Sequence, residues 1–508
     1  MIRRDRERQG NQMSQNGIMF QYFEWYMQDL QNDLWIRLKE DAPRLAGLGI
    51  SSVWIPPAFK ATSPLDTGYG TYDLYDLGEF DQKGSVKTKY GTKEELLAAI
   101  AALHEHGIQV YADVVLNHKA NGDETETFLV REVDPSDRTS PISEPYEIEA
   151  WTKFTFPGRG DRYSAFQWNW SHFTGTDFNA RDNRRSVYMI EGINKGWCQG
   201  VTYENGNFDY LMFNDIDYKH PDVVKEIRSW AIWFLNETKV DGFRFDAVKH
   251  INDFFLRDLV RKIRGEYRQD FYAVGEYWHQ DEEEVNNYLD QTDYEMDLFD
   301  VRLHFNFHHA SLAGADYDLT TIFDGTLVQN HPAMAVTFVD NHDSQPTQAL
   351  QSWVEPWFKP LAYSMILLRQ DGYPKIFYGD YFGIKAPESI EGHQAILDQL
   401  IYLRNQHAYG EQVDYLDHPN VIGWVRLGDE VHPYGCAVLL SNGEEGEKLM
   451  NVGSINQGAV YADYTGSRTD KVTIDPDGNG LFRCNAGQVS VWVRDQVTPE
   501  EAFNEENL

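Results

Sequence analysis

The chain has 508 residues, more than one domain usually holds, although a single barrel with insertions can absorb about 400 of them. We therefore expect one large domain and at least one smaller one. The 80 acidic and 45 basic residues give a formal net charge of −35. Such a surface repels phosphate backbones and anionic lipids, so nucleic acid and membranes are not expected partners.

Few features of the chain point to export or to a membrane. The basic residues of segment 1–17 are not followed by an apolar stretch, so we expect no secretory signal and no membrane span. Met13 is an alternative start site. The three cysteines, Cys198, Cys436 and Cys484, are odd in number and lack C-x-x-C spacing. This favours a reducing cytoplasm, with a trimmed secreted form as the alternative.

From residue 17 onward, short β-rich runs alternate with helical patterns, which is typical of βα units around a parallel sheet. The helical pattern at 93–106 places its large apolar residues on one face and ends at Gly107, a favourable residue just after a helix. Eight candidate strands predict a closed (β/α)8 TIM barrel. These strands are 17–23, 50–55, 108–116, 240–246, 271–276, about 296–301, 333–340 and 374–378, and further helices fit 221–239, 252–266, 360–370 and 393–406.

Two parts of the chain do not fit the barrel pattern. Residues 118–219 are too many for a simple crossover and are rich in Gly, Asn, Asp and aromatic residues, so they predict an inserted domain. After about residue 411, short alternating β runs predict a C-terminal antiparallel β-sandwich. The expected domains are a barrel of 1–117 and 220–410, an insertion of 118–219 and a sandwich of 411–508.

Polar residues close four of the predicted strands, where the catalytic groups of α/β barrels gather. The segments are 113–118 (DVVLNH), 242–250 (GFRFDAVKH), 275–278 (GEYW) and 338–343 (FVDNHD). A single Asp at a strand end is more often a turn or cap residue. Independent caps are not expected to recur with His, Asp and Glu at successive barrel openings, so the four segments together predict a carboxylate-based barrel enzyme.

The central pair of acids is Asp246 and Glu276. Arg244 and Asp246 are two apart in a strand and leave the same face, so the guanidinium favours an ionised Asp246. Glu276 ends the next strand, one inter-strand spacing away. Two carboxyls about 5–5.5 Å apart would hydrolyse a glycoside with retention. The charge of Asp343 is expected to raise the pKa of Glu276 and keep it protonated, while His118 and His342 are candidate partners for sugar hydroxyls.

These four segments resemble the hallmark regions of the α-amylase family, glycoside hydrolase family 13. The resemblance extends from GIMFQYFEWYM to IGWVRLGD. Within the family, the chain is similar to the liquefying bacterial members in particular. The resemblance implies that Asp246 is the nucleophile, Glu276 the general acid/base and Asp343 the transition-state stabiliser. It further implies substrate-binding roles for Tyr69, His118, Arg244, Lys249, His250, Trp278 and His342, with Tyr69 stacking on the sugar. The alternative is that Tyr69 and Trp278 are simply aromatic residues of the core.

The resemblance also implies a calcium ion held by hard oxygen ligands. Asn117, Asp209, Asp215 and the backbone carbonyl of His250 match the family's main site. The chain departs from calcium-rich relatives at Thr174 and Cys198, where those relatives place carboxylates. We therefore expect one calcium and no multi-metal cluster. The alternative is that the two aspartates only solvate a loop.

The resulting hypothesis is a monomeric, cytoplasmic, endo-acting α-amylase that cleaves internal α-1,4 bonds of starch, glycogen and maltodextrins with retention. A transglycosylase or an exo-acting oligosaccharide hydrolase on the same scaffold is the alternative among enzymes. A glucan-binding protein without catalytic activity is the alternative among non-enzymes. The three intact acids Asp246, Glu276 and Asp343 argue against it.

Overall fold

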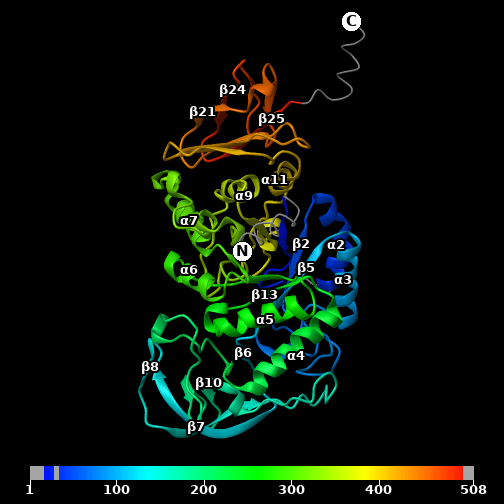
Figure 1. The fold of residues 1–508 in the computed structure, drawn as a ribbon, viewed down its shortest axis with the longest axis vertical. Helices are drawn as coiled ribbons and strands as arrows, with labels where there is room; N and C mark the ends of the chain where they lie inside the picture. Colours follow the sequence, from blue (N-terminus) through cyan, green and yellow to red (C-terminus); the bar gives the residue numbers. More distant parts are fainter. Residues whose placement is uncertain (1–15, 28–33, 496–508) are drawn as a thin grey trace. The chain divides into compact units, whose positions relative to one another are not determined.

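The computed structural model describes residues 16–27 and 34–495 (Figure 1). The chain forms two compact units, one of residues 20–301 and one of residues 1–19 with 302–508. This division runs through the barrel strands, so the predicted boundaries at 117, 219 and 410 stay predictions. The predicted lack of a secretory signal concerns mainly residues 1–15, which lie outside the described part.

The predicted (β/α)8 barrel is confirmed. Its strands close in the order β1-β17-β16-β15-β14-β13-β5-β2, and every predicted strand overlaps one of them. Each strand is short and almost entirely buried, as expected for a parallel sheet covered by helices. The bounds are β1 (Met19–Gln21), β2 (Ser52–Ile55), β5 (Gln109–Val114), β13 (Gly242–Phe245), β14 (Tyr272–Gly275), β15 (Asp297–Phe299), β16 (Ala335–Phe338) and β17 (Tyr373–Phe377).

The predicted helices are present, and local sequence explains their ends. Helix α3 begins after Thr92, whose hydroxyl accepts from the Glu95 amide while the Glu95 carboxylate accepts from the Thr92 amide. Gly107 follows this helix with φ +73°, as predicted. The bounds of the main helices are α2 (Leu34–Leu48), α3 (Lys93–Glu105), α4 (Pro221–Thr238), α5 (Asp253–Glu266), α6 (Glu282–Gln291), α7 (Val301–Ala313), α9 (Lys359–Leu368) and α11 (Gln394–Gln406).

The segment between β5 and α4 forms a separate antiparallel sheet, seen in Figure 1 around β7, β8 and β10. Its first strand pairs with its last, because β6 and β12 are joined through His118 and Asp215. This pairing brings the residues that follow barrel strand β5 next to the end of the insertion. The strands are β6 (His118–Lys119), β7 (Glu124–Asp134), β8 (Asp137–Pro141), β9 (Tyr146–Lys153), β10 (Phe173–Asn179), β11 (Arg184–Ile190) and β12 (Asn214–Ile216).

The predicted C-terminal sandwich is confirmed as two antiparallel sheets around an apolar core that includes Val425, Leu439, Phe482 and Trp492. β21 and β24 form the smaller sheet, and the six other strands form the larger one. The bounds are β18 (Gln412–Tyr415), β19 (Val421–Arg426), β20 (Cys436–Ser441), β21 (Gly446–Asn451), β22 (Val460–Asp463), β23 (Lys471–Thr473), β24 (Asn479–Cys484) and β25 (Val489–Arg494).

Candidate active site

The register of three barrel strands aligns the two predicted catalytic acids. Phe245 of β13 is paired with Gly275 of β14 on one side and with Val114 of β5 on the other. Asp246 and Glu276 are the next residues of their strands, so they emerge at the same level on neighbouring strands. Their strand ends coincide with the edge where barrel enzymes carry their chemistry.

The Arg244 side chain joins these acids. Its Nη1 lies 2.7 Å from Asp246 Oδ1 and 3.0 Å from Asp113 Oδ1, and its Nη2 lies 3.3 Å from Glu276 Oε2. The guanidinium is 1% exposed. One planar cation therefore serves three carboxyl groups from the neighbouring strands β5, β13 and β14, so carboxyl groups outnumber cations in this buried site.

Glu276 has the environment of a proton donor. Burial raises the pKa of Glu276, the nearby charge of Asp246 raises it further, and Arg244 opposes the shift. The expected direction is thus present, although burial rather than Asp343 is its main cause. The Ala247 amide donates to Glu276 Oε2 at 3.0 Å, from a residue held at φ +49° and ψ +41°. An alanine in this left-handed conformation is strained, and here the strain orients a donor.

Asp113 contacts Arg244. The sequence marked Asp113 only as part of the segment DVVLNH. Its Oδ2 accepts hydrogen bonds from the Tyr69 hydroxyl at 2.8 Å and from Trp54 Nε1 at 3.1 Å. Burial raises the pKa of Asp113 to about 7. The Tyr69 ring stacks on Trp25, with ring centroids 5.7 Å apart. We call Arg244, Asp113, Asp246, Glu276, Tyr69 and Trp54 the Arg244 network.

His118 connects Tyr69 to Asn117. Its Nε2 faces the Tyr69 carbonyl at 2.8 Å, so Nε2 carries the proton and donates. Its Nδ1 is then an acceptor and lies 3.3 Å from Asn117 Nδ2. Burial lowers the pKa of His118, in agreement with a neutral ring. Because the Asn117 amide nitrogen faces His118, the Asn117 oxygen points to a different neighbour.

Other residues of this unit that were predicted to bind substrate follow β13 and β14 and contact the inserted segment. Lys249 Nζ contacts both carboxylate oxygens of Glu204, at 2.8 and 3.0 Å, and the carbonyl of Trp278 at 3.0 Å. His250 Nδ1 donates to the Phe208 carbonyl at 2.7 Å, and burial lowers the pKa of His250 to about 3. Glu204 belongs to the inserted segment, and the sequence did not reveal its pairing with Lys249.

Asp343 and His342 follow β16 in the other compact unit. His342 Nε2 lies 3.3 Å from Asp343 Oδ2, and the Asp343 side chain is 23% exposed. The Asp343 and Ser344 amides both donate to Asn341 Oδ1, at 2.9 and 2.8 Å. These bonds fix the turn that presents Asp343.

A second group of buried charges supports this turn. Asp340 Oδ1 accepts from the Ser344 hydroxyl at 2.7 Å, and Oδ2 lies 2.7 Å from Lys359 Nζ. Lys359 also pairs with Asp380, whose other oxygen accepts from the Tyr363 hydroxyl at 2.6 Å. Lys375 Nζ donates to the Asp340 carbonyl at 2.6 Å. We call Asp340, Ser344, Lys359, Tyr363, Lys375 and Asp380 the Lys359 network.

The four residues predicted to supply calcium ligands are all buried, and Asp209 and Asp215 lie close enough to affect each other. Asp215 Oδ2 accepts from the Thr174 hydroxyl, and Asp209 Oδ2 accepts from the Cys198 amide at 2.8 Å. Asp215 Oδ1 is buried and has no hydrogen-bond partner among the described residues. Burial raises the pKa of Asp209 to about 6 and the pKa of Asp215 well above its usual value, and each acid affects the other. A cation would relieve this repulsion, so these oxygens fit calcium.

The chain offers few other side chains for a metal. Within residues 16–27 and 34–495, no three His, Cys, Asp or Glu side chains cluster in a way that could hold one. The predicted site therefore depends on two carboxylates supplemented by an amide and a backbone carbonyl.

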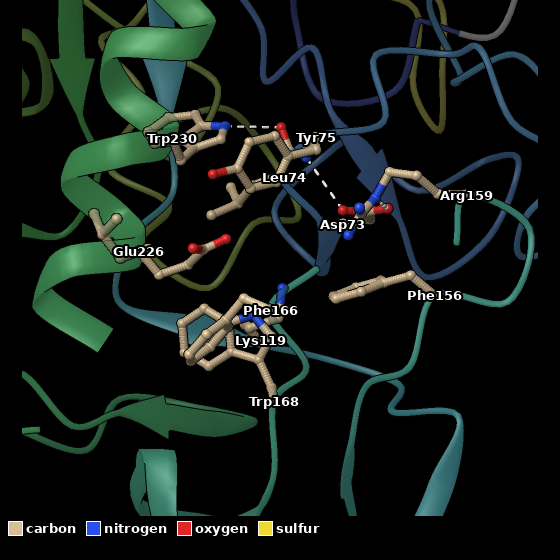
Figure 2. Close-up of a pocket in the computed structure, with 11 residues that line it drawn as sticks. Asp73, Leu74, Tyr75, Lys119, Phe156, Arg159, Phe166, Trp168, Glu226 and Trp230 are labelled. Carbon is tan, nitrogen blue, oxygen red and sulfur yellow. Dashed lines mark hydrogen bonds and ion pairs between the residues drawn. The ribbon is translucent and has the colours of Figure 1, made fainter. Parts of the chain in front are cut away.

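A separate pocket is lined by Asp73 of β4 (Thr71–Asp73) together with Lys119, Arg159 and Trp230 (Figure 2). None of the predicted catalytic acids lines it. Its charged groups are already engaged, because Arg159 Nε lies 2.7 Å from Asp73 Oδ2 and Lys119 Nζ donates to the Tyr72 carbonyl. These contacts stabilise the inserted segment, and they leave the charged groups of the pocket without a role in a second reaction site.

The barrel and its shared guanidinium define the class: a barrel enzyme that works with carboxylates. Comparison with known proteins identifies the family. Residues 39–412 match the alpha amylase catalytic domain, and the chain belongs to the α-amylase family and is a glycoside hydrolase.

Relatives match nearly the whole chain. It is 51% identical over 485 residues to an alpha-amylase of Geobacillus stearothermophilus, covering 95% of this chain and 88% of that one. It is 50% identical to a glucan 1,4-alpha-maltohexaosidase of Bacillus sp. (strain 707), over 94% and 92% of the two chains. It is 43% identical to the cytoplasmic alpha-amylase of Escherichia coli (strain K12), over 95% and 99%.

A solved Anoxybacillus alpha-amylase has the same fold, with a TM-score of 0.62 and 18% identity over 95% of this chain and 98% of that one. None of the helices in the described residues has the length and apolarity needed to cross a membrane.

Proposed function

We propose that this glycoside hydrolase is an endo-acting α-amylase that cleaves internal α-1,4 bonds of starch, glycogen and maltodextrins and retains the anomeric configuration. The observation that carries the proposal is the Arg244 guanidinium, which holds Asp246 and Glu276 side by side on adjacent strands. Two carboxyls held so closely suit a double displacement, in which one attacks and the other transfers the proton.

In the proposed reaction Asp246 attacks the anomeric carbon while Glu276 protonates the departing glycosidic oxygen. Glu276, now ionised, then removes a proton from water, which attacks the glycosyl–Asp246 ester and releases the product. The raised pKa of Glu276 favours the protonated form needed for the first step. Its ionised form is stabilised during the second step by Arg244 and by the Ala247 amide.

The proposed roles around this pair follow the contacts of each residue. Tyr69, whose hydroxyl is fixed by Asp113, offers its ring face to the sugar at the cleavage point. Lys249 and Trp278, joined by a hydrogen bond, line the neighbouring subsites. The other proposed contacts are His118 and His250 from the same unit, and His342 from the turn of Asp343, which stabilises the transition state.

We also propose one structural calcium ion, with Asn117, Asp209, Asp215 and the His250 carbonyl as its ligands. Asp215 Oδ1, which has no hydrogen-bond partner within the described part of the chain, and the repulsion that the buried Asp209 exerts on Asp215 support it. When bound, calcium supplies positive charge that binds the insertion to the barrel. We expect chelator to lower the melting temperature and excess calcium to restore it. Asp215→Asn should weaken this calcium response, whereas the exposed Asp182→Asn should not.

We further propose that the protein acts as a monomer in the cytoplasm. The printed name of the Escherichia coli relative, a cytoplasmic alpha-amylase, and the unpaired buried cysteines support this location. Cell fractionation followed by size-exclusion chromatography tests both statements.

A transglycosylase or an exo-acting hydrolase remains the second candidate. It is favoured by the relative named for maltohexaose release and by the glucanotransferases among the structures of similar fold. Product analysis decides between them. An endo-acting enzyme shortens long amylose before small products accumulate, an exo-acting enzyme releases one oligosaccharide from the start, and a transglycosylase makes chains longer than its substrate.

The direct test of the catalytic pair uses a maltoheptaoside blocked at its non-reducing end. We expect the native protein to cleave it and Glu276→Gln to lose roughly 10⁴-fold in kcat, because the proton donor is removed. The matched control is Glu282→Gln, an exposed acid at the start of α6. Cleavage by Glu276→Gln at the native rate would contradict the assignment.

A further inference from the structure

Lys195 is a buried ammonium surrounded by oxygen atoms. It lies in the insertion, between β11 and β12. Its Nζ is 2.5 Å from the Ser171 carbonyl, 2.9 Å from the Phe173 carbonyl and 2.8 Å from Asp217 Oδ2. The side chain is only 6% exposed. All of these groups belong to the unit of residues 20–301.

This arrangement differs from that of the neighbouring Lys219, which approaches the same carboxylate from outside. Lys219 Nζ lies 3.4 Å from Asp217 Oδ1, and its side chain is 35% exposed. It differs also from Lys119, whose Nζ donates to one carbonyl and otherwise faces the rings of Phe154, Phe156 and Trp168. Lys195 alone of these three has two backbone carbonyls and a carboxylate converging on a buried cation.

A carboxylate and two carbonyls converging at 2.5 to 2.9 Å resemble the oxygen shell of a hard metal ion, whose bonds are slightly shorter, at about 2.3–2.6 Å for calcium. The position is also rich in acidic groups, because Asp217 follows the buried Asp215 by two residues. A buried carboxylate in such surroundings needs a cation beside it.

We propose that the Lys195 ammonium is a built-in cation, which fills a metal position beside the candidate calcium region and makes an ion there unnecessary. Removing the ammonium should uncover a latent site of one carboxylate and two carbonyls that takes Na⁺ or Ca²⁺. This inference rests on the contacts of Lys195 and not on the proposed glucan chemistry.

The test measures thermal unfolding of the full-length protein after chelation, in buffers of equal ionic strength containing choline, Na⁺ or Ca²⁺. In choline, Lys195→Ala should melt about 5 °C or more below the native protein, because Asp217 loses its buried partner. Na⁺ should restore at least half of this loss in Lys195→Ala, with a saturating dependence on concentration, and should not raise the melting temperature of the native protein.

Two further variants serve as controls. Lys119→Ala removes an equally buried ammonium but leaves an aromatic lining, so its loss of melting temperature should be the same in choline and in Na⁺. Lys195→Gln places a neutral amide among the oxygens of Ser171, Phe173 and Asp217. This variant should therefore be destabilised and should not respond to Na⁺. If Lys195→Ala folds only when Na⁺ or Ca²⁺ is present, the inference is supported.

Three results would overturn the inference. These are a Lys195→Ala melting temperature that is equally low in all three salts, no loss of stability in Lys195→Gln, and failure of Lys195→Ala to fold under every condition. Calcium titration of the native protein separates this inference from the proposed calcium site. If the native protein binds no calcium while Lys195→Ala gains a Na⁺ response, the calcium proposal fails and the inference about Lys195 stands.

Discussion

The Arg244 network and the Lys359 network are both buried groups of charges at the ends of barrel strands, yet they are built differently. In the Arg244 network one cation faces three carboxylates. In the Lys359 network one ammonium pairs with two aspartates, a second ammonium, Lys375, donates to the Asp340 backbone carbonyl, and each oxygen of the two carboxylates has a donor. Carboxyl groups therefore outnumber cations in the first network, whereas their numbers are balanced in the second.

The comparison shows that a shifted pKa alone does not mark the reaction site. Burial raises the pKa to about 7 both for Asp113 and for Asp340. The distinguishing property is the surplus of carboxyl groups over cations around Glu276, whose pKa is raised mainly by burial and further by the charge of Asp246. The balanced network instead uses its charges to hold the turn at 340–344.

Of the effects expected from altering the two networks, the largest comes from removing the shared cation. Arg244→Met should lower kcat by about 10³-fold and the free energy of unfolding by about 3–5 kcal/mol, because three buried carboxylates lose their partner. The control is Arg159→Met, which removes an equally buried guanidinium paired with Asp73. It should lower stability but leave the kcat of the folded protein unchanged. Steady-state kinetics measures kcat, and urea unfolding measures the free energy of unfolding. Equal losses of kcat in the two variants would show that Arg244 has no special role in the reaction.

A smaller effect on the reaction is expected from the balanced network. Asp340→Asn should lower kcat roughly 10-fold, because Ser344 and the turn that carries Asp343 lose their anchor. Asp380→Asn breaks the same ammonium pair on the side away from the turn, so it should cost similar stability with a smaller change in kcat. If the two variants have the same kcat, the network does not position the turn.

The stability of the protein should also depend on pH through His304, which lies beside the Lys359 network. Its Nδ1 donates to the Val339 carbonyl, and burial lowers its pKa to about 3. Because an unfolded histidine has a pKa of about 6.5, the unfolded state binds the proton first. Stability is therefore full above pH 6.5 and is lost as the pH falls toward 3. His304→Asn should reduce this slope by about 1.4 kcal/mol per pH unit, and an unchanged slope in urea titrations would contradict it.

The smallest expected effect concerns the strained residue between the two acids. Ala247→Gly should raise the free energy of unfolding by up to about 1 kcal/mol, because glycine adopts the left-handed conformation without strain. Ala247→Val should lower stability by more than that. The Ala247 amide still reaches Glu276 in both variants, so kcat should change little in the folded protein. Destabilisation by glycine in chemical unfolding would show that the backbone is not strained there.

Sequence predicted the barrel strands well because each is a short, mostly apolar run, a signal confined to a few neighbouring positions, and four of them are closed by polar residues. The pair Asp246 and Glu276 was predicted from two of the polar residues that close barrel strands. Asp113 could have been found too, since a charged residue within the apolar run IQVYADVVL is costly unless it has a partner.

Other residues gave no such signal. Lys359 resembles any lysine at the start of a helix, and Glu204 resembles any loop acid, because their partners lie far away in the sequence. The buried surroundings of Lys195 depend on strands that are distant along the chain. These roles come from tertiary contacts, which local patterns do not encode.

The most direct test of the central claim is the configuration of the first product. Proton NMR of the blocked maltoheptaoside during the first seconds of cleavage, before mutarotation, reports the anomer at the new reducing end. Because Arg244 holds Asp246 and Glu276 together, we expect the α anomer. Initial formation of the β anomer would mean that water attacks directly between more widely separated carboxyls, and it would contradict the proposed double displacement.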